Sequence, residues 1–200
     1  MNVQRPRRVV VAGGPGGGKT TAVDLFRREI GSSIVVVPEA ATMLFSGGFP
    51  RDGTVESRAA VQRAIYYVQR NLEDAQAARH PDRALLCDRG TVDGAAYWPG
   101  SPEAFFAEVG STLEAELARY DAVVFFESAS IGGMSIEGGN PMRTEDAEAA
   151  ARLDRALRAL WSKHPRFVVI SHTSSFLLKI TAGLAVLRNV LAQLDEDEAA

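Results

Sequence analysis

Two kinds of apolar segment alternate along the chain: short continuous runs and longer stretches with helical spacing. In the longer stretches apolar residues recur three and four positions apart, the spacing of an amphipathic helix. In the short runs nearly every residue is apolar, as in strands that are buried on both faces of a parallel sheet. The short runs are 8–12, 34–37, 84–88, 122–126 and 167–170. The alternation predicts an α/β fold in which helices cover a doubly wound, five-stranded parallel sheet.

The longest predicted helix covers about 55–79. It begins after Thr54, a favourable N-cap residue, and ends before Pro81. Its apolar stripe, predicted to be the buried face, consists of Val61, Ile65, Val68, Leu72 and Ala75. The polar residues on its other faces are predicted to be solvated. They include Arg63, Gln69, Arg70 and Glu73.

Capping patterns delimit other helices. A helix over 19–29 ends before Gly31. Ser101 followed by Pro102 opens another helix, and the stretch from Ser111 to Glu114 resembles a capping box. Thr144 precedes a helix whose first turn is acidic, as the helix dipole favours.

The last two helices carry apolar stripes. The stripes are predicted to be buried and consist of Leu153, Leu157, Leu160 and Trp161 in the first helix and Leu177, Ile180, Leu184, Leu187 and Leu191 in the second. The acidic residues 195–200 that follow are predicted to fray. We therefore expect a single domain over 1–194.

Composition narrows the class of protein. The 200 residues, 46% of them apolar, suffice for one domain with a sizeable core. The net charge of −3 argues against binding of nucleic acid by bulk charge. The single cysteine, Cys87, excludes an internal disulfide and suits a reducing compartment. Because no signal-length apolar region follows the basic N-terminus and no apolar run approaches the roughly 20 residues that span a bilayer, we expect a cytoplasmic protein without an integral membrane segment.

The stretch GGPGGGKT, at 13–20, carries the clearest chemistry. It fits G-x-x-x-x-G-K-[ST], the P-loop that wraps the phosphates of a nucleotide. An apolar run precedes it and an amphipathic run follows, which is the strand–loop–helix context that the motif requires. Lys19 is expected to reach the β- and γ-phosphates and the Thr20 hydroxyl to ligate Mg²⁺. The expected nucleotide contacts are Gly13, Gly14, Pro15, Gly16, Gly17, Gly18, Lys19, Thr20 and Thr21.

Charged residues follow the second and third predicted strands. Asp88 ends the third strand, like a Walker B aspartate, and is expected to lie near Mg²⁺ or to act as a base. Glu39, just past the second strand, is the other candidate base, and a solvated loop carboxylate is its alternative. Arg89 is a candidate contact for substrate or phosphate, with an ion pair to Asp88 or Asp93 as the alternative. Asp93 is a weaker candidate for a substrate contact.

Motifs that define other classes of P-loop protein differ from this sequence. The N-K-x-D and D-x-x-G motifs of switch GTPases do not occur in it. Hexameric AAA+ motors usually carry Asp-Glu at the end of the Walker B strand, whereas this chain has Asp88-Arg89. Aspartate followed by arginine is the pair that many nucleoside and nucleotide kinases carry at this position.

Five blocks of the sequence resemble the P-loop AAA-domain family that contains the ribosylnicotinamide kinase domain of NadR-type proteins and the TRP-like translocation-defect proteins. The blocks are VVAGGPGGGKTT (10–21), VPEAATML (37–44), CDRGTVDGAAY (87–97), YDAVVFF (120–126) and NPMRTEDAEAAARLDRALRALWSKHP (140–165). They follow the family's order over about 8–180. The VPEAAT and CDRGT blocks are closer to the translocation-defect branch, which is associated with nucleotide and phosphoinositide binding.

The resemblance implies a nucleoside-kinase-like fold with strand order 2-3-1-4-5 and a lid at about 128–146. The glycine-rich stretch 131–140 is too long for an ordinary turn, and loops of such length in a compact domain are usually lids or binding loops. Arg143 is expected to close on the transferring phosphoryl group. Asn140 is a weaker candidate.

These patterns predict a P-loop phosphotransferase or NTPase that binds Mg²⁺ and ATP, or GTP. The leading interpretation is a kinase that passes the γ-phosphoryl group to a hydroxyl or phosphate of a nucleoside-like acceptor. The alternative is a nucleotide-binding regulator with slow hydrolysis that acts on a protein or lipid partner. A degenerate interaction module is disfavoured because Lys19 and Thr20 are intact. Neither the acceptor nor the oligomeric state follows from the sequence, and no nucleic-acid partner is expected.

Overall fold

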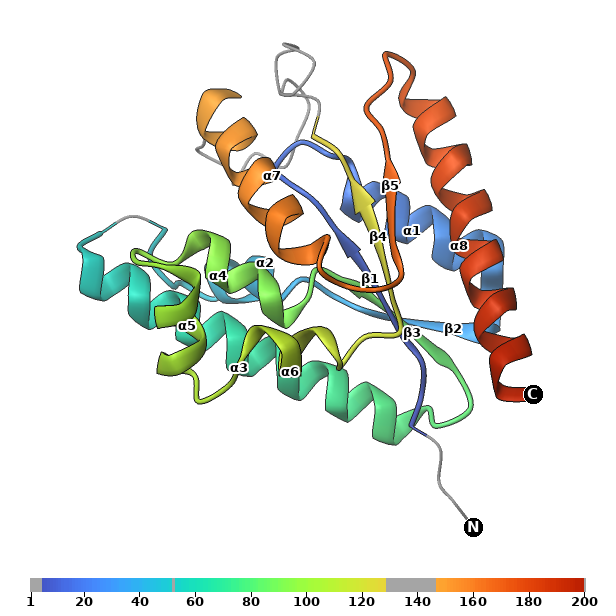
Figure 1. Ribbon diagram of the computed structural model, residues 1–200, viewed down its shortest axis with the longest axis horizontal. Helices are drawn as coiled ribbons and strands as arrows, with labels where there is room; N and C mark the ends of the chain where they lie inside the picture. Colours follow the sequence, from blue (N-terminus) through green and yellow to red (C-terminus); the bar gives the residue numbers. More distant parts are fainter. Residues whose placement is uncertain (1–4, 52, 129–146, 200) are drawn as a thin grey trace.

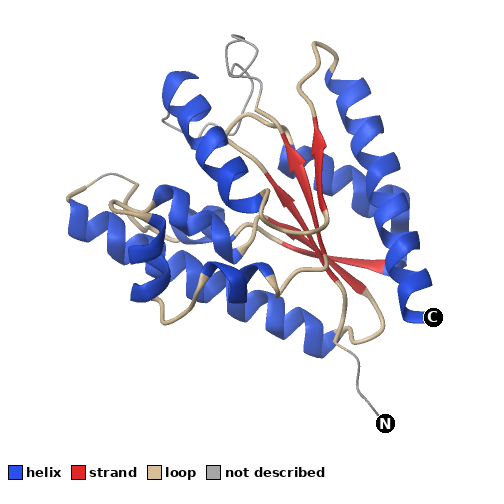
Figure 2. Ribbon diagram, in the orientation of Figure 1, coloured by secondary structure: helices blue, strands red, loops and turns tan. Residues whose placement is uncertain are grey.

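The computed structural model describes residues 5–51, 53–128 and 147–199. At its centre is a five-stranded parallel sheet in the order β2-β3-β1-β4-β5 (Figures 1 and 2). The strands are β1 (Arg8–Ala12), β2 (Ile34–Val37), β3 (Ala84–Asp88), β4 (Ala122–Phe126) and β5 (Phe167–Ile170). All five coincide with the predicted apolar runs, and the strand order is the predicted one.

Helices cover both faces of the sheet (Figure 1). The helices are α1 (Lys19–Ile30), α2 (Ala40–Ser46), α3 (Val55–Arg79), α4 (Gly94–Tyr97), α5 (Pro102–Glu108), α6 (Leu113–Leu117), α7 (Ala147–Trp161) and α8 (Phe176–Ala199), with 3₁₀ turns at Gly31–Ser33 and Thr91–Asp93. Alternate residues of each strand enter two separate cores. Val9 and Val11 pack with α1 and α8, whereas Val10 and Ala12 pack with α3 and with α4 to α7.

Parallel pairing brings the carboxyl ends of the strands to one edge. Val11 pairs with Asp88 of β3, and Ala12 pairs with Phe125 of β4. The residues that follow β1, β2 and β3 therefore meet above this edge, where ligands of open α/β sheets bind. They comprise the phosphate loop, Glu39 and Arg89.

The long helix α3 differs from the prediction in its buried face. Gln69 and Glu73 were predicted to be solvated, but they are 3% and 0% exposed. Ala75, by contrast, lies on the exposed side. The fully buried line on α3 is Val61, Tyr66, Gln69, Glu73 and Ala77. Two polar side chains can occupy it because other buried polar groups satisfy their hydrogen bonds.

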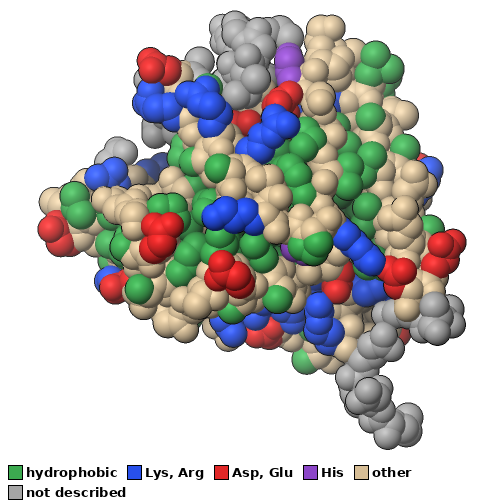
Figure 3. All heavy atoms as spheres, viewed as in Figure 1, with side chains coloured by type: hydrophobic (Ala, Val, Ile, Leu, Met, Phe, Trp, Pro, Cys, Tyr) green, Lys and Arg blue, Asp and Glu red, His purple; other side chains and the backbone are tan. Residues whose placement is uncertain are grey.

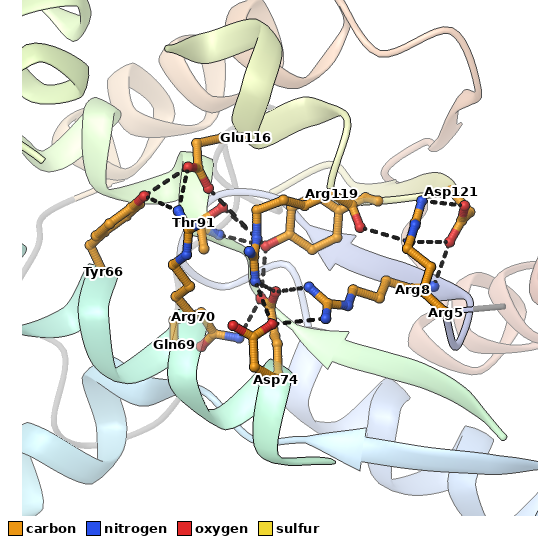
Figure 4. A network of polar contacts seen from close by, with 12 residues as sticks. Arg5, Arg8, Tyr66, Gln69, Arg70, Asp74, Thr91, Glu116, Arg119 and Asp121 are labelled. Atoms are coloured by element: carbon orange, nitrogen blue, oxygen red, sulfur yellow. Dashed lines mark hydrogen bonds and ion pairs between the residues drawn. The ribbon is translucent and has the colours of Figure 1, made fainter. Parts of the chain in front are cut away.

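A network of polar contacts connects α3 with neighbouring segments (Figure 4). By its hydrogen bonds, the fully buried Glu73 is at the centre of this network. One of its oxygens accepts hydrogen bonds from Arg119 (2.9 Å) and Arg8 (3.5 Å). The other accepts from Tyr120 Oη (2.7 Å) and Gln69 Nε2 (3.2 Å). Burial nevertheless raises the pKa of the Glu73 carboxyl, and the arginine and tyrosine contacts oppose this shift. The network joins α3 to the start of β1 and to the segment before β4.

Helix ends follow the predicted chemistry with one exception. Thr54 accepts a hydrogen bond from Ser57 N and caps α3, and Ser101 accepts from Ala104 N and caps α5. The N-cap of α6 is Thr112, which accepts from Ala115 N. Ser111 was predicted in the capping role, but its hydroxyl donates to the Glu116 carboxylate instead (2.6 Å). The start of α7 near Thr144 lies outside the described residues.

The last helix is longer and more exposed at its start than predicted. Helix α8 continues to Ala199 through the acidic end that was predicted to fray. Leu177, assigned to its buried stripe, is 71% exposed, whereas Ile180 and Leu187 are buried. By length and composition alone, Phe176–Asp197 is long and apolar enough to cross a membrane, which is weak evidence because core helices of globular proteins meet the same criterion. In this fold it packs along α1, β4 and β5.

Charged side chains on one face of the molecule are interspersed. Figure 3 shows lysine and arginine side chains scattered among aspartate and glutamate rather than gathered in one broad area. Such a mixture creates no extended potential of a single sign on this face.

Candidate functional site

The loop between β1 and α1 adopts backbone conformations that favour glycine. Gly13, Gly16 and Gly18 have φ values of 135°, 73° and 80°. A Cβ atom on Gly13 would lie 2.1 Å from the carbonyl oxygen of Phe126, so the loop lies directly against the end of β4. Gly18 is the N-cap of α1. A glycine loop that ends in a helix N-terminus suits a bound phosphate.

Lys19, Thr20 and Asp88 form the polar centre of the site. Lys19 is 4% exposed, and its Nζ donates a hydrogen bond to the carbonyl of Gly14 (2.6 Å). Thr20 Oγ1 donates to Asp88 Oδ2 (2.9 Å), and Asp88 Oδ1 is buried without a hydrogen-bond partner among the residues that the structure describes. Mg²⁺ prefers hard oxygen ligands such as carboxylates. The orphaned oxygen beside a threonine hydroxyl therefore fits the metal that the P-loop implies.

A second carboxylate influences Asp88. Burial raises the pKa of the Asp88 carboxyl, and the negative charge of Glu39 raises it further. The positive charges of Lys19 and Arg89 act in the opposite direction. Glu39 is thus close enough for its charge to be felt at the metal-binding position. A bound cation there would favour the ionised form of Asp88.

Two buried charged residues support the phosphate loop. Asp154, on α7, accepts hydrogen bonds at Oδ1 from the backbone N–H groups of Gly14 (2.8 Å) and Ser128 (3.0 Å). Lys179, on α8, donates to the carbonyl oxygens of Gly17 (3.0 Å) and Glu127. Burial raises the pKa of Asp154 and lowers that of Lys179. Helices α7 and α8 thereby tie the loop to the end of β4.

Arg89 joins the ends of three strands. Among the described residues it is the only non-glycine residue with a positive φ, 75°. Its guanidinium pairs with Glu39 and with Asp93 (3.1 Å), and it donates to the carbonyl of Gly13 (3.3 Å). Trp161 Nε1 donates to the second oxygen of Asp93 (2.6 Å). Such a backbone conformation costs about 1–3 kcal/mol, and these surrounding contacts hold it in place.

Gln69 connects the two segments that carry Glu39 and Arg89. Its Oε1 accepts a hydrogen bond from Ala40 N (3.2 Å), directly after Glu39. Its Nε2 donates to the carbonyl of Arg89 (3.3 Å). Through its bond to Glu73 it belongs to the network in Figure 4. The polar core beneath α3 therefore supports the backbone on both sides of the Glu39–Arg89 pair.

A cavity of about 400 Å³ opens beside this pair. One part of its wall is formed by the paired residues Glu39, Arg89 and Asp93. Apolar and aromatic side chains from α2, α3, α4 and α7 form much of the remainder, among them Phe45, Val61, Ile65, Tyr97 and Leu153. A volume of this size suits a small-molecule ligand.

The predicted site residues divide into three groups. Those brought together are the phosphate loop with Lys19 and Thr20, Asp88, Glu39, Arg89 and Asp93. Thr21, predicted as a phosphate contact, is exposed on α1. Arg143 and Asn140 lie outside the described residues. The ion pair between Arg89 and Asp93, weighed as an alternative to substrate contact, is present, and Glu39 is an additional partner.

Several residues of the site carry no recognisable motif. Gln69, Asp154 and Lys179 act through backbone atoms that are far away in sequence. A partial signal exists for Gln69 and Glu73, because the spacing from Tyr66 through Gln69 and Glu73 to Ala77 is helical. Polar residues in the middle of an otherwise apolar helical line indicate a buried polar contact.

The parallel sheet and the glycine loop between β1 and α1 define a P-loop NTPase fold. The model of a protein family described as an AAA domain matches residues 8–176. The chain therefore belongs to this family of P-loop AAA domains, in which nucleotide binding is the general property. No curated protein matches the sequence significantly.

Proposed function

We propose that the protein is a kinase that transfers the γ-phosphoryl group of Mg²⁺·ATP to a small, nucleoside-like acceptor. The observation that carries the proposal is the cavity beside the Glu39–Arg89 pair, with Glu39 in its wall. Hydrolysis alone needs only water next to the γ-phosphate. A cavity with a carboxylate near the metal-binding position offers room for a second substrate and a group that can accept its proton.

Each step of the proposed phosphoryl transfer is assigned to particular residues of the chain. Lys19 binds the β- and γ-phosphates. Thr20 and Asp88 would hold Mg²⁺, which would supply positive charge to neutralise the phosphates. Glu39 takes the proton of an acceptor hydroxyl while the oxygen of that hydroxyl bonds to the γ-phosphorus. The bond from that phosphorus to the bridging oxygen breaks, and ADP leaves. Arg89 and Thr42 hold Glu39 in place, because each donates a hydrogen bond to one of its oxygens. Closure of Arg143 on the phosphoryl group remains a prediction.

The start of α8 favours a second candidate function, that of a nucleotide-dependent regulator. Phe176, Leu177 and Leu178 are 51%, 71% and 64% exposed. A Cβ on Gly18 would lie 2.6 Å from the Phe176 ring, so this apolar group adjoins the phosphate loop. A protein or lipid partner that binds here would sense the bound nucleotide.

Acceptor-dependent turnover distinguishes the two functions. We expect ADP formation from Mg²⁺·ATP to rise at least about tenfold when a suitable hydroxyl compound is present, because the acceptor completes the site. The measurement is a coupled ADP assay over nucleosides, nucleotides and sugars, with mass spectrometry of the product. Slow hydrolysis that no acceptor stimulates, together with a partner captured only in one nucleotide state, would favour the regulator.

Replacement of Gln69 by leucine should lower turnover while leaving the affinity for nucleotide nearly unchanged. Leucine removes the hydrogen bonds to Ala40 N and the Arg89 carbonyl, so Glu39 and Arg89 lose their common support. We expect kcat to fall about tenfold and the free energy of unfolding to fall by about 1–3 kcal/mol. Steady-state kinetics well below the unfolding temperature measure kcat, calorimetric titration measures the affinity for nucleotide, and denaturant unfolding measures the change in stability. Gln76→Leu, on the same helix, is the control. Equal loss in kcat and nucleotide affinity would contradict a positioning role.

A further inference from the structure

We propose that the cavity binds an acceptor that carries an anionic group, a phosphate or a carboxylate, held by Arg51 and Arg58, and that presents a hydroxyl group to Glu39. This inference rests on the proposed kinase function and specifies the class of acceptor. It follows from the placement of charge around the cavity, from the length of α2, and from the aromatic side chains between the charged groups.

Charge in the cavity wall is unevenly compensated. The Arg89 guanidinium is paired with the carboxylates of both Glu39 and Asp93. Arg51 and Arg58 also line the cavity, and neither has a carboxylate partner among the residues that the structure describes. Among the described residues, the charged side chains of the wall are three arginines and two carboxylates. Within the described part of the wall, the positive charge without a carboxylate partner is therefore that of Arg51 and Arg58.

Helix α2 separates the two charged groups. Glu39 is its N-cap, and Phe45 lies in its last turn. A helical rise of 1.5 Å per residue places their backbones about 9 Å apart. The Arg51 guanidinium lies over the Phe45 ring, 4.3 Å from its centroid. A ligand that reaches from Glu39 to Arg51 therefore has the size of a substituted ring compound rather than a simple ion.

The wall between the charged groups is largely apolar and aromatic. Phe45, Tyr97 and Trp98 contribute rings, and Val61 and Ile65 contribute aliphatic surface. Rings of this kind bind the flat face of a base or a sugar. Guanidinium groups bind phosphate and carboxylate by paired N–H donors. The combination matches a mononucleotide-like compound whose phosphate points away from Glu39.

The orientation defines the reaction. The acceptor hydroxyl oxygen bonds to the γ-phosphorus of ATP, its proton passes to Glu39, and the bridging oxygen leaves with ADP. The anionic group of the acceptor stays unchanged at Arg51 and Arg58. The product is therefore a new phosphate ester on the acceptor and not a phosphoanhydride.

The test compares nucleosides with their 5′-monophosphates as acceptors at saturating Mg²⁺·ATP. Coupled ADP formation gives kcat and KM, and ³¹P NMR identifies the new bond. Calorimetric titration of the same compounds, with the phosphate loop filled by a non-hydrolysable ATP analogue, measures binding without turnover. The variants are Arg51→Ala/Arg58→Ala and, as a control, Arg63→Ala, because Arg63 lies on α3, pairs with Glu108 and does not line the cavity.

We expect the monophosphates to have a KM at least about tenfold below that of the nucleosides. The double variant should raise the KM of the monophosphates by about tenfold or more, with little effect on the nucleosides or on the KM for ATP. Arg63→Ala should change none of these values.

Other results separate this inference from the proposed function. Nucleosides that serve as well as monophosphates, with a double variant like the wild type, would overturn the anionic acceptor and leave the kinase intact. A phosphoanhydride product would overturn the orientation. Arginine-dependent binding of monophosphates without any transfer would support the anion site and contradict the kinase. Absence of both binding and turnover would contradict both.

Discussion

Lys19→Ala should lower the affinity for Mg²⁺·nucleotide by about 100-fold and remove turnover, while the fold persists. In the structure the Lys19 ammonium is almost fully buried inside the phosphate loop and donates to the Gly14 carbonyl. A bound nucleotide offers phosphate oxygens in place of that neutral acceptor. Hydrogen bonds to charged groups contribute about 1.5–3 kcal/mol, and a 100-fold loss corresponds to about 2.7 kcal/mol.

Calorimetric titration with Mg²⁺·ATP and with a non-hydrolysable analogue measures the loss. Lys19→Met is a second variant, because its unbranched side chain fills similar space without charge. Lys163→Ala, at an exposed lysine, is the control. Thermal unfolding should show a cooperative transition in all three variants. If Lys19→Ala binds nucleotide as tightly as the wild type, the loop has no part in binding.

The fold follows from the sequence to a large extent because its strands are buried on both faces. A parallel sheet between helix layers requires continuous apolar runs, and runs such as 122–126 are visible without any knowledge of distant contacts. The phosphate loop is equally local. Its glycines, Lys19 and Thr20 are consecutive, so the motif and its strand–helix context can be recognised together.

The supporting residues could not be found in this way, because their partners are distant in sequence. The buried carboxylate of Glu73 accepts hydrogen bonds from Arg8, 65 residues before it, and from Arg119, 46 residues after it. Without those partners the same residue on the same helix would be solvated, which is what its residue type alone predicts. Asp154 is likewise separated by 140 residues from the loop that it holds. Periodicity indicates which side of a helix faces inward. It does not indicate which polar side chains of distant segments lie against that side.

The roles of Glu39 and Asp88 could be predicted from the sequence only in part. The sequence places both carboxylates at the ends of neighbouring strands and leaves open which one is the base. In the structure the two carboxylates have different surroundings. Asp88 bonds to Thr20 and keeps one oxygen without a partner, as a metal ligand would, whereas Glu39 lines the cavity. We therefore assign the base to Glu39 and the metal to Asp88 as a proposal.

Glu39→Gln should reduce acceptor-dependent turnover by about 10²–10⁴-fold, the usual contribution of a general base, and leave the affinity for Mg²⁺·ATP close to that of the wild type. The amide keeps the shape of the side chain and its contact with Thr42, but it cannot take a proton. Asp88→Asn should instead raise the Mg²⁺ concentration needed for half-maximal binding of nucleotide.

Two controls make the assignment decisive. Glu103→Gln changes an exposed carboxylate on α5 and should have no effect on turnover. Thr42→Val keeps the Glu39 carboxylate but removes one of its hydrogen bonds, so it should lower kcat far less than Glu39→Gln. Normal turnover in Glu39→Gln, with turnover lost in Asp88→Asn at saturating Mg²⁺, would transfer the role of base to Asp88. In that case Glu39 serves only to hold Arg89, and the acceptor hydroxyl must lie closer to Asp88 than to Glu39.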